Sequence, residues 1–130
     1  MDLQMKSTHK FIVFAIKDKL VQVETVGDSE STYEDFLKSL PANDCRYAVY
    51  KMSFTKPAST DGLNEGRRTK TVFVLWAPGS ANIKDKFVYS ASKESLKWKL
   101  QGGLNIEIQA GKVADLSEQQ MLDKCLALTK

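Results

Sequence analysis

Hydrophobic and polar positions along the chain first predict a set of strands. Lys10 to Ile16 reads KFIVFAI, a nearly continuous apolar run that indicates a strand buried on both faces. Val21 to Val26 alternates between apolar and polar residues, as a strand exposed on one side does. Two runs rich in Val, Tyr and Phe, Arg46 to Phe54 and Thr71 to Trp76, predict the next strands, and Asn105 to Ala110 predicts a last one.

A first helix is predicted between the second and third strands. Ser31 and Glu34 have the spacing of a capping box, in which a side chain at each position bonds the backbone of the other. We therefore expect a helix from Thr32 to Leu40, which stops before Pro41.

Two further helices follow the fourth strand. The longer is expected from about Asn82 to Gln101, and the pair Gly102 and Gly103 is a natural C-terminal stop. The last is expected from Ser117 to Leu128, where Ser117 and Gln120 again have capping-box spacing.

The segment from Thr55 to Lys70 is polar and contains Pro57, Gly62 and Gly66, so it predicts a projecting hairpin loop longer than a tight turn requires. Strands and helices are intermixed along the whole chain. That order predicts the α/β class, as an α+β sandwich with a mixed central sheet of about five strands flanked by helices.

Composition narrows the class of protein. A chain of 130 residues fits a single domain, spanning 1–130. The net charge of +3 is too small to argue for nucleic-acid binding by itself. The first residues lack the pattern of a secretory signal, and no apolar run is long enough to span a bilayer, so we expect a cytoplasmic protein.

The sequence offers little chemistry for catalysis or metal binding. Cys45 and Cys125 are far apart and outside any Cys-x-x-Cys spacing, which predicts buried, reduced thiols. His9 is the single histidine, and a lone histidine that lacks a Cys, Ser or metal-ligand partner is typical of a structural or exposed residue. Phosphate-binding Gly-rich loops and nucleophile motifs are absent from the sequence. We expect no enzyme activity, no cofactor and no metal site.

The basic residues are concentrated between Arg67 and Lys99. On a helical wheel Lys86, Lys93 and Lys97 fall within roughly 40° of one another. The apolar residues broadly opposite them are Phe87, Val88, Ala91 and Trp98. One interpretation is that the lysines solvate the outer face of an amphipathic helix. The other interpretation is a surface that binds an acidic protein. It is favoured because this part of the helix has few acidic residues to balance its lysines.

Five motifs, in order and spacing along nearly the whole chain, resemble the actin-depolymerising factor/cofilin family. They are KFIVFAI (10–16), YEDFLKSLPANDCRYAVY (33–50), EGRRTK (65–70), VLWAPGSANIKDKFVYSASKESL (74–96) and SEQQMLDKCL (117–126). The second motif is especially similar to plant and protist members. The resemblance implies the ADF-homology, gelsolin-like fold.

The resemblance also implies the function. Members of this family bind actin monomers and the sides of filaments, favour the ADP form, and promote severing and depolymerisation as monomers without a cofactor. Residues matching those that bind both monomer and filament are Lys84, Lys86, Phe87, Lys93 and Lys97. Residues matching those that bind filaments are Arg68, Lys70, Asp123 and Lys124. Lys93, Lys97 and Lys99 are candidates for phosphoinositide head groups, which inhibit relatives.

The sequence departs from the family pattern at its start and in the long helix. Asp2 to Met5 already matches the end of the family's first helix, and Ser7 does not match the regulatory serine that precedes it. We therefore expect weaker affinity and severing, and apolar area exposed on one face of the sheet. Lys97 and Trp98 stand where relatives carry two basic residues.

Two other functions stay open on these residues. One is an actin binder that has lost severing, and the other is a peripheral module whose basic helix binds phosphoinositides. Nucleic-acid binding is least favoured, because the aromatic residues are expected in the core and do not alternate with the basic ones.

Overall fold

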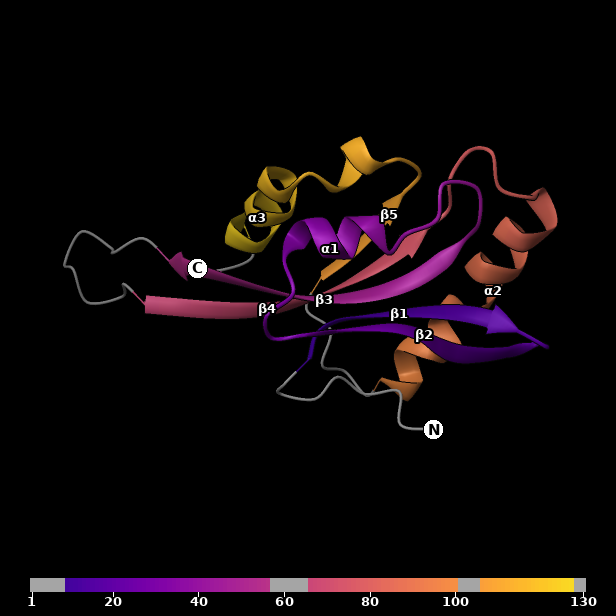
Figure 1. Cartoon of the computed structure of the whole chain (residues 1–130), viewed down its shortest axis with the longest axis horizontal. Coiled ribbons are helices and arrows are strands. Elements are labelled where there is room, and N and C mark those ends of the chain that lie inside the picture. Colours follow the sequence, from indigo (N-terminus) through magenta and orange to yellow (C-terminus); the bar gives the residue numbers. More distant parts are fainter. Residues whose placement is uncertain (1–8, 57–65, 101–105, 128–130) are drawn as a thin grey trace.

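In this computed structural model the described residues are 9–56, 66–100 and 106–127. Their secondary structure confirms the predicted order of strands and helices, with one short 3₁₀ helix added (Figure 1). The elements are β1 (His9–Lys17), β2 (Leu20–Asp28), α1 (Tyr33–Lys38), β3 (Arg46–Lys56), β4 (Gly66–Trp76), α2 (Ile83–Lys99), β5 (Ile106–Ala110), η1 (Val113–Leu116) and α3 (Glu118–Ala127).

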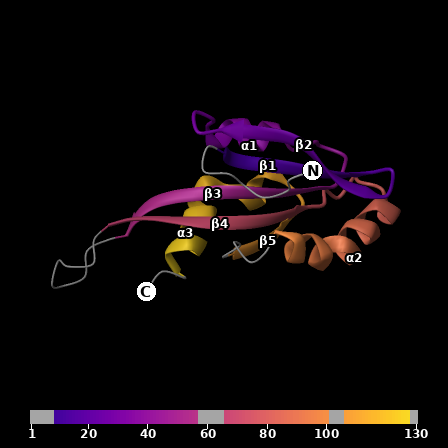
Figure 2. The ribbon, with the colours of Figure 1, turned by 90° about the horizontal axis from the view of Figure 1, so that it is seen from below.

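The strands form the predicted mixed sheet, in the order β2-β1-β3-β4-β5. The pairs β2–β1, β1–β3 and β3–β4 are antiparallel, whereas β4–β5 is parallel. A parallel pair needs a crossover, and α2 lies in the connection between β4 and β5. This topology places α2 next to β5 at one edge of the sheet (Figure 2).

The hairpin β1–β2 turns through Asp18 and Lys19, which both have positive φ, 52° and 66°. Two consecutive residues of this kind form a tight turn that matches the right-handed twist of the strands. Gly27 in β2 is required by a close approach, because a Cβ there would lie 2.1 Å from the ring of Phe11. These two features determine how β2 lies against β1.

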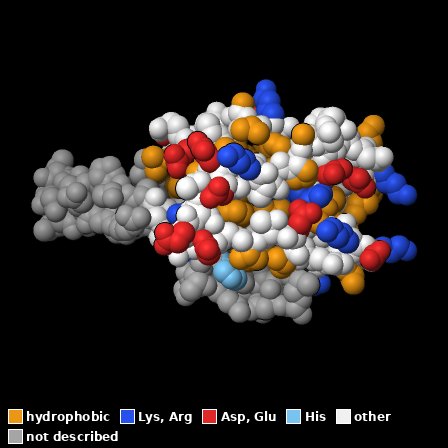
Figure 3. Space-filling view, viewed as in Figure 1, with side chains coloured by type: hydrophobic (Ala, Val, Ile, Leu, Met, Phe, Trp, Pro, Cys, Tyr) orange, Lys and Arg blue, Asp and Glu red, His pale blue; other side chains and the backbone are white. Residues whose placement is uncertain are grey.

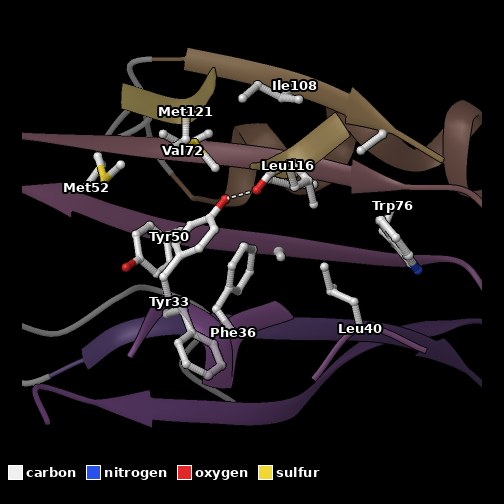
Figure 4. Packing of buried hydrophobic residues seen from close by; sticks show 14 of the residues in the cluster. Tyr33, Phe36, Leu40, Tyr50, Met52, Val72, Trp76, Ile108, Leu116 and Met121 are labelled. Carbon is white, nitrogen blue, oxygen red and sulfur yellow. Dashed lines mark hydrogen bonds between the residues drawn. The ribbon is translucent and has the colours of Figure 1, made fainter. Parts of the chain in front are cut away.

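One hydrophobic cluster lies between the sheet and the helices α1 and α3 (Figure 4). The ring of Phe36 on α1 lies 5.4 Å from that of Phe11 and 4.9 Å from that of Tyr50, centroid to centroid. The hydroxyl of Tyr33 donates to the carbonyl of Leu116, which joins α1 to η1 on this face of the sheet.

A second cluster lies on the opposite face, where α2 packs, because successive strand residues point to opposite faces. Its strand residues include Ile12, Phe14, Tyr47 and Phe73, each 2% exposed or less. The expectation of exposed apolar area on one face of the sheet is therefore wrong at these four positions. β1 is buried on both faces, as its continuous apolar run predicts. On β2, Val26 pairs with Ile12 and is 46% exposed, so apolar area is exposed on that face at the β2 edge.

The predicted boundary of the long loop is wrong. The strands β3 and β4 continue to Lys56 and from Gly66, so both ends of the segment predicted as a loop are paired strand. The register pairs Lys56 with Gly66 and Phe54 with Arg68. The prediction failed because it relied on polar composition, and polar residues also occur in paired strand.

The predicted cap of the first helix is also displaced by one residue. Thr32 and Asp35 form the capping box, instead of Ser31 and Glu34. The last helix is capped as predicted, since the Oγ of Ser117 accepts from the amide of Gln120 at 3.2 Å. The proposed stop at Gly102 and Gly103 lies outside the described residues.

Candidate functional site

The helix α2 starts at a clear cap. The side chain of Asn82 accepts a hydrogen bond from the amide of Lys84 at 2.7 Å, which satisfies one of the unpaired donors of the first turn. Asp85 lies in the first turn, and Lys97 and Lys99 lie in the last turn, where their charges complement the helix dipole. The helix is thus defined at both ends by its own sequence.

The inner side of α2 is narrow and carries two buried residues, Tyr89 and Leu96. The hydroxyl of Tyr89 accepts a hydrogen bond from the amide of Ile16 in β1 at 2.8 Å, and its carbonyl accepts one from the hydroxyl of Tyr47. Leu96 is 1% exposed and belongs to the same cluster. These contacts set the rotation of α2 about its axis.

The outer side of α2 exposes three large apolar side chains around the charged side chain of Glu94, which the sequence analysis missed. Ile83 is 82% exposed, Phe87 is 73% exposed and Trp98 is 84% exposed. On a helical wheel these three fall within about 60° of one another and almost opposite Tyr89 and Leu96. The expectation that the aromatic residues lie in the core is wrong for Phe87 and Trp98. The spacing of Ile83, Phe87 and Trp98 places them on one side of the helix, but the spacing alone does not show that this side faces solvent.

The predicted basic stripe lies beside the buried side of α2 instead of at its outermost edge. The Nζ of Lys93 lies 2.8 Å from Glu107 on β5, and Lys97 pairs with the same carboxylate. The Nζ of Lys86 donates to the carbonyl of Gly79 at 3.0 Å. The interpretation that these lysines only solvate the outer face is therefore wrong, because they hold α2 against its neighbours.

Glu107 joins α2 to the edge strand of the sheet. Hydrogen bonds from Lys93 and then from Lys97 hold the pKa of the Glu107 carboxyl below its usual range. The same bond to Glu107 raises the pKa of Lys97. One carboxylate thus offsets part of the charge of Lys93 and Lys97, whereas Lys84 and Lys99 are the exposed lysines of α2.

A second candidate surface forms where the β3–β4 ribbon projects. β1 pairs with β3 only over Phe11–Phe14 and Tyr47–Tyr50, whereas β3 and β4 remain paired to Lys56 and Gly66. The two strands consequently extend beyond their neighbours (Figures 1 and 2). Arg68 lies on this ribbon opposite Phe54, and Lys70 lies opposite Met52 and is partly buried.

The helix α3 lies next to this ribbon. Burial raises the pKa of the Cys125 thiol on α3, and the nearby charge of Lys70 opposes that shift. On the outer side of α3 Asp123 and Lys124 are exposed, and Asp123 accepts from Gln119 at 2.8 Å. These two residues also line an open hollow between α3 and β5. The structure therefore brings Lys70 and the α3 pair to one region, on the sheet face opposite α2.

The described residues show no other candidate chemistry. No three of their His, Cys, Asp and Glu side chains come together at a site able to hold a metal ion. Cys45 and Cys125 are buried thiols, as predicted. Within the described part of the chain no helix is both long and apolar enough to cross a membrane. Acidic and basic side chains are interspersed over the face seen in Figure 3.

Comparison with known proteins gives consistent matches. Residues 1–126 match the family described as cofilin/tropomyosin-type actin-binding protein. Actophorin of Acanthamoeba castellanii is 39% identical over 125 residues, which cover 95% of this chain and 85% of that protein. Actin-depolymerizing factor 2 of Arabidopsis thaliana is 39% identical over 110 residues, 85% of this chain and 75% of the relative. The crystal structure of Streptomyces griseoflavus cofilin superposes with a TM-score of 0.77 at 34% identity, covering 91% of this chain and 83% of that one.

Proposed function

The chain belongs to the cofilin/tropomyosin-type family of actin-binding proteins, and from this membership we propose that it binds actin monomers and filament sides and promotes filament depolymerisation. It is a binding protein and not an enzyme, in keeping with its family. Its effect on filaments then comes from differential affinity for two arrangements of actin subunits.

The observation that carries this proposal is the outer side of α2. Ile83 and Phe87 present apolar side chains to solvent, and Lys84 is exposed beside them. An amphipathic helix of this kind binds by laying its apolar side into a groove of its partner. The apolar contacts supply affinity, while a charge at the rim speeds encounter and fixes orientation toward an acidic surface.

We assign Lys84, Lys86, Phe87, Lys93 and Lys97 to the surface that binds monomers and filaments alike. Their parts are unequal. Lys84 is exposed, whereas Lys93 and Lys97 both pair with the carboxylate of Glu107. Glu107 therefore neutralises part of the positive charge that Lys93 and Lys97 present to a partner. We expect Lys84 and Phe87 to contribute more than Lys93 and Lys97.

We assign Arg68, Lys70, Asp123 and Lys124 to filament binding. Lys70 and α3 lie on the sheet face opposite α2, so one molecule of this chain can contact two partners at once. A filament offers two adjoining subunits and a monomer offers one. This geometry supports binding between successive subunits of a filament, with a preference for the ADP form and severing as the outcome.

Phosphoinositide head groups are a further proposed partner, acting from the cytoplasmic side of a membrane. The ammonium groups of Lys93 and Lys97 converge on one carboxylate of Glu107, so an anionic phosphate could compete for them. Lys99 is exposed on the last turn of the same helix. Binding to phosphoinositide vesicles at physiological salt, measured by flotation, tests this partner.

Paired charge reversals test the division between the two surfaces. Lys84→Glu with Lys86→Glu should weaken binding to both monomers and filaments, because α2 faces actin in each complex. Arg68→Glu with Lys70→Glu should weaken co-sedimentation with ADP-actin filaments and leave monomer binding unchanged.

A matched control is Lys19→Glu with Lys38→Glu, which changes the net charge equally at two exposed positions off both surfaces. It should bind as the unchanged chain does. Equal losses in both assays for the two test pairs would contradict the assignment of separate surfaces.

A further inference from the structure

Trp98 is the most exposed large hydrophobic side chain on α2, at 84%. The other tryptophan, Trp76, is 2% exposed, and its indole N–H donates to the carbonyl of Pro41 at 2.7 Å. A tryptophan in solvent exposes a large apolar surface without stabilising the fold, and exposed aromatic residues of this size are typical centres of binding energy at interfaces. The role of Trp98 therefore lies outside the folding of this chain.

Trp98 continues the apolar side of α2 that is proposed to contact actin. It falls about 20° from Phe87 on the helical wheel and extends the apolar side over 15 residue steps from Ile83, roughly 22 Å along the axis. Ala91, between Phe87 and Trp98, also lies on this side and is exposed. The stripe thus runs along nearly the full length of the helix and is interrupted by Glu94, whose side chain is 75% exposed.

The contacts of its neighbours hold Trp98 outward. Leu96 and Leu100 are buried at 1% and 9% exposure, and Lys97 pairs with Glu107. These residues flank Trp98 on both sides in sequence and fix the last turn of α2 against the sheet. An indole whose helix is already fixed loses little backbone entropy when a partner covers it.

Resting on the proposed function, we propose that Trp98 is an apolar anchor for actin, which extends the contact from the N-terminal turns of α2 to its last turn. Its partner surface is an apolar hollow on actin with polar groups at the rim, because Lys99 is exposed next to Trp98 and Glu94 is exposed one turn before it on the same side of the helix. Binding at this end of the helix depends on burial more than on charge pairing. It is consequently less sensitive to salt than binding through Lys84.

The first test is co-sedimentation of variants with ADP-actin filaments over a range of filament concentrations. Trp98→Ala should raise the Kd about tenfold or more, as truncation of an interface hot spot does. Trp98→Phe keeps a large apolar side chain and should bind within about threefold of the unchanged chain.

Two further variants sharpen this test. Leu20→Ala removes another exposed apolar side chain, 65% exposed and off the α2 surface, and should not change the Kd. Trp98→Lys should bind measurably only at low salt, because it replaces burial by a screened charge. Equal binding by Trp98→Ala and the unchanged chain overturns the proposal.

The second test observes Trp98 directly. The chain has two tryptophans, so labelling with 5-fluorotryptophan gives two fluorine resonances, and Trp98→Phe assigns them. In the free protein only the exposed Trp98 should show a solvent isotope shift between H₂O and D₂O. Adding actin monomer should abolish that shift if actin covers the indole.

The outcomes separate this inference from the proposed function. If actin binds and Trp98 keeps its isotope shift, the anchor is wrong and the proposed function stands. If the unchanged chain binds no actin, the proposed function fails and the anchor with it. Loss of the shift without actin, on concentrating the protein alone, overturns actin as the occupant, because a second copy of the chain then covers the indole.

Discussion

The helices α2 and α3 both pack one side against the sheet, but they expose different kinds of side chain on the other side. α3 buries Met121 and Cys125 against the sheet and exposes Asp123 and Lys124, the arrangement expected of an amphipathic surface helix. α2 has 17 residues and α3 has 10, yet the buried residues of α2 are Tyr89 and Leu96. The outer side of α2 exposes apolar residues along the helix.

The difference shows which features folding explains and which need a partner. The sequence of α3 is accounted for by burial on one side and hydration on the other. In α2 the lysines beside the sheet are paired with Glu107 while the apolar stripe faces water, so hydration alone does not explain its outer side. The few inner contacts of α2 account for its packing, and the proposed binding to actin would account for its outer side.

The largest expected effect is on the free energy of unfolding, and it distinguishes the inner side of α2 from its outer side. Leu96→Ala removes a side chain that is 1% exposed and should lower the free energy of unfolding by about 2–5 kcal/mol. Ile83→Ala, on the outer side of the same helix, should change it by less than about 0.5 kcal/mol. Urea unfolding followed by circular dichroism measures both, and similar losses would mean that the outer side of α2 also packs within this chain.

An intermediate effect is expected where α2 bonds the sheet. Tyr89→Phe removes the hydroxyl that accepts from the amide of Ile16 at 2.8 Å, and should cost about 1–3 kcal/mol because a partly buried donor loses its partner. Ser90→Ala, exposed on the next position, is the control and should be near neutral. Urea unfolding at fixed pH checks the difference, and equal stabilities would show that water replaces the tyrosine.

The smallest effect concerns the pair of lysines held by β5. Glu107→Gln should lower stability at neutral pH by about 1 kcal/mol or less, since exposed ion pairs contribute little. The pKa of Glu107 is depressed in the folded state, so its contribution is present above the ordinary pKa of 4.5 and is lost as pH falls through the lower folded value.

The difference in unfolding free energy between the unchanged chain and Glu107→Gln should therefore shrink toward zero in acid and shrink in high salt. Chemical unfolding at neutral and acidic pH measures it. A difference that stayed constant across this range would mean that the ion pairs do not stabilise the folded chain.

Much of the fold could be predicted because its signals are local. The apolar run of β1 indicated burial on both faces, and Ser117 with Gln120 indicated the start of α3. The first cap was missed because Ser31–Glu34 and Thr32–Asp35 have the same spacing. The choice between them depends on Asp28, whose carboxylate accepts from the hydroxyl of Ser31 at 3.4 Å and leaves Thr32 as the cap.

The orientation of α2 could not be predicted from its own sequence. A helical wheel shows which residues share a side but not which side meets the sheet. That choice is made by distant residues, namely Ile16, Tyr47 and Glu107, which bond Tyr89 and the lysines across long separations in sequence. The resemblance named Phe87 as an apolar contact residue, and the structure shows that it is exposed. The exposure of Trp98 emerged only once α2 was placed on the sheet.

The most direct test of the account is co-sedimentation of the double variant Ile83→Ser with Phe87→Ser alongside the unchanged chain, using ADP-actin filaments. Urea unfolding of both proteins should coincide, because both side chains are exposed. If the outer side of α2 binds actin, we expect the unchanged chain to pellet with filaments and to raise soluble actin. We expect the variant to stay in the supernatant and to leave actin in the pellet. A variant that pellets and depolymerises like the unchanged chain would contradict the claim that the outer side of α2 binds actin.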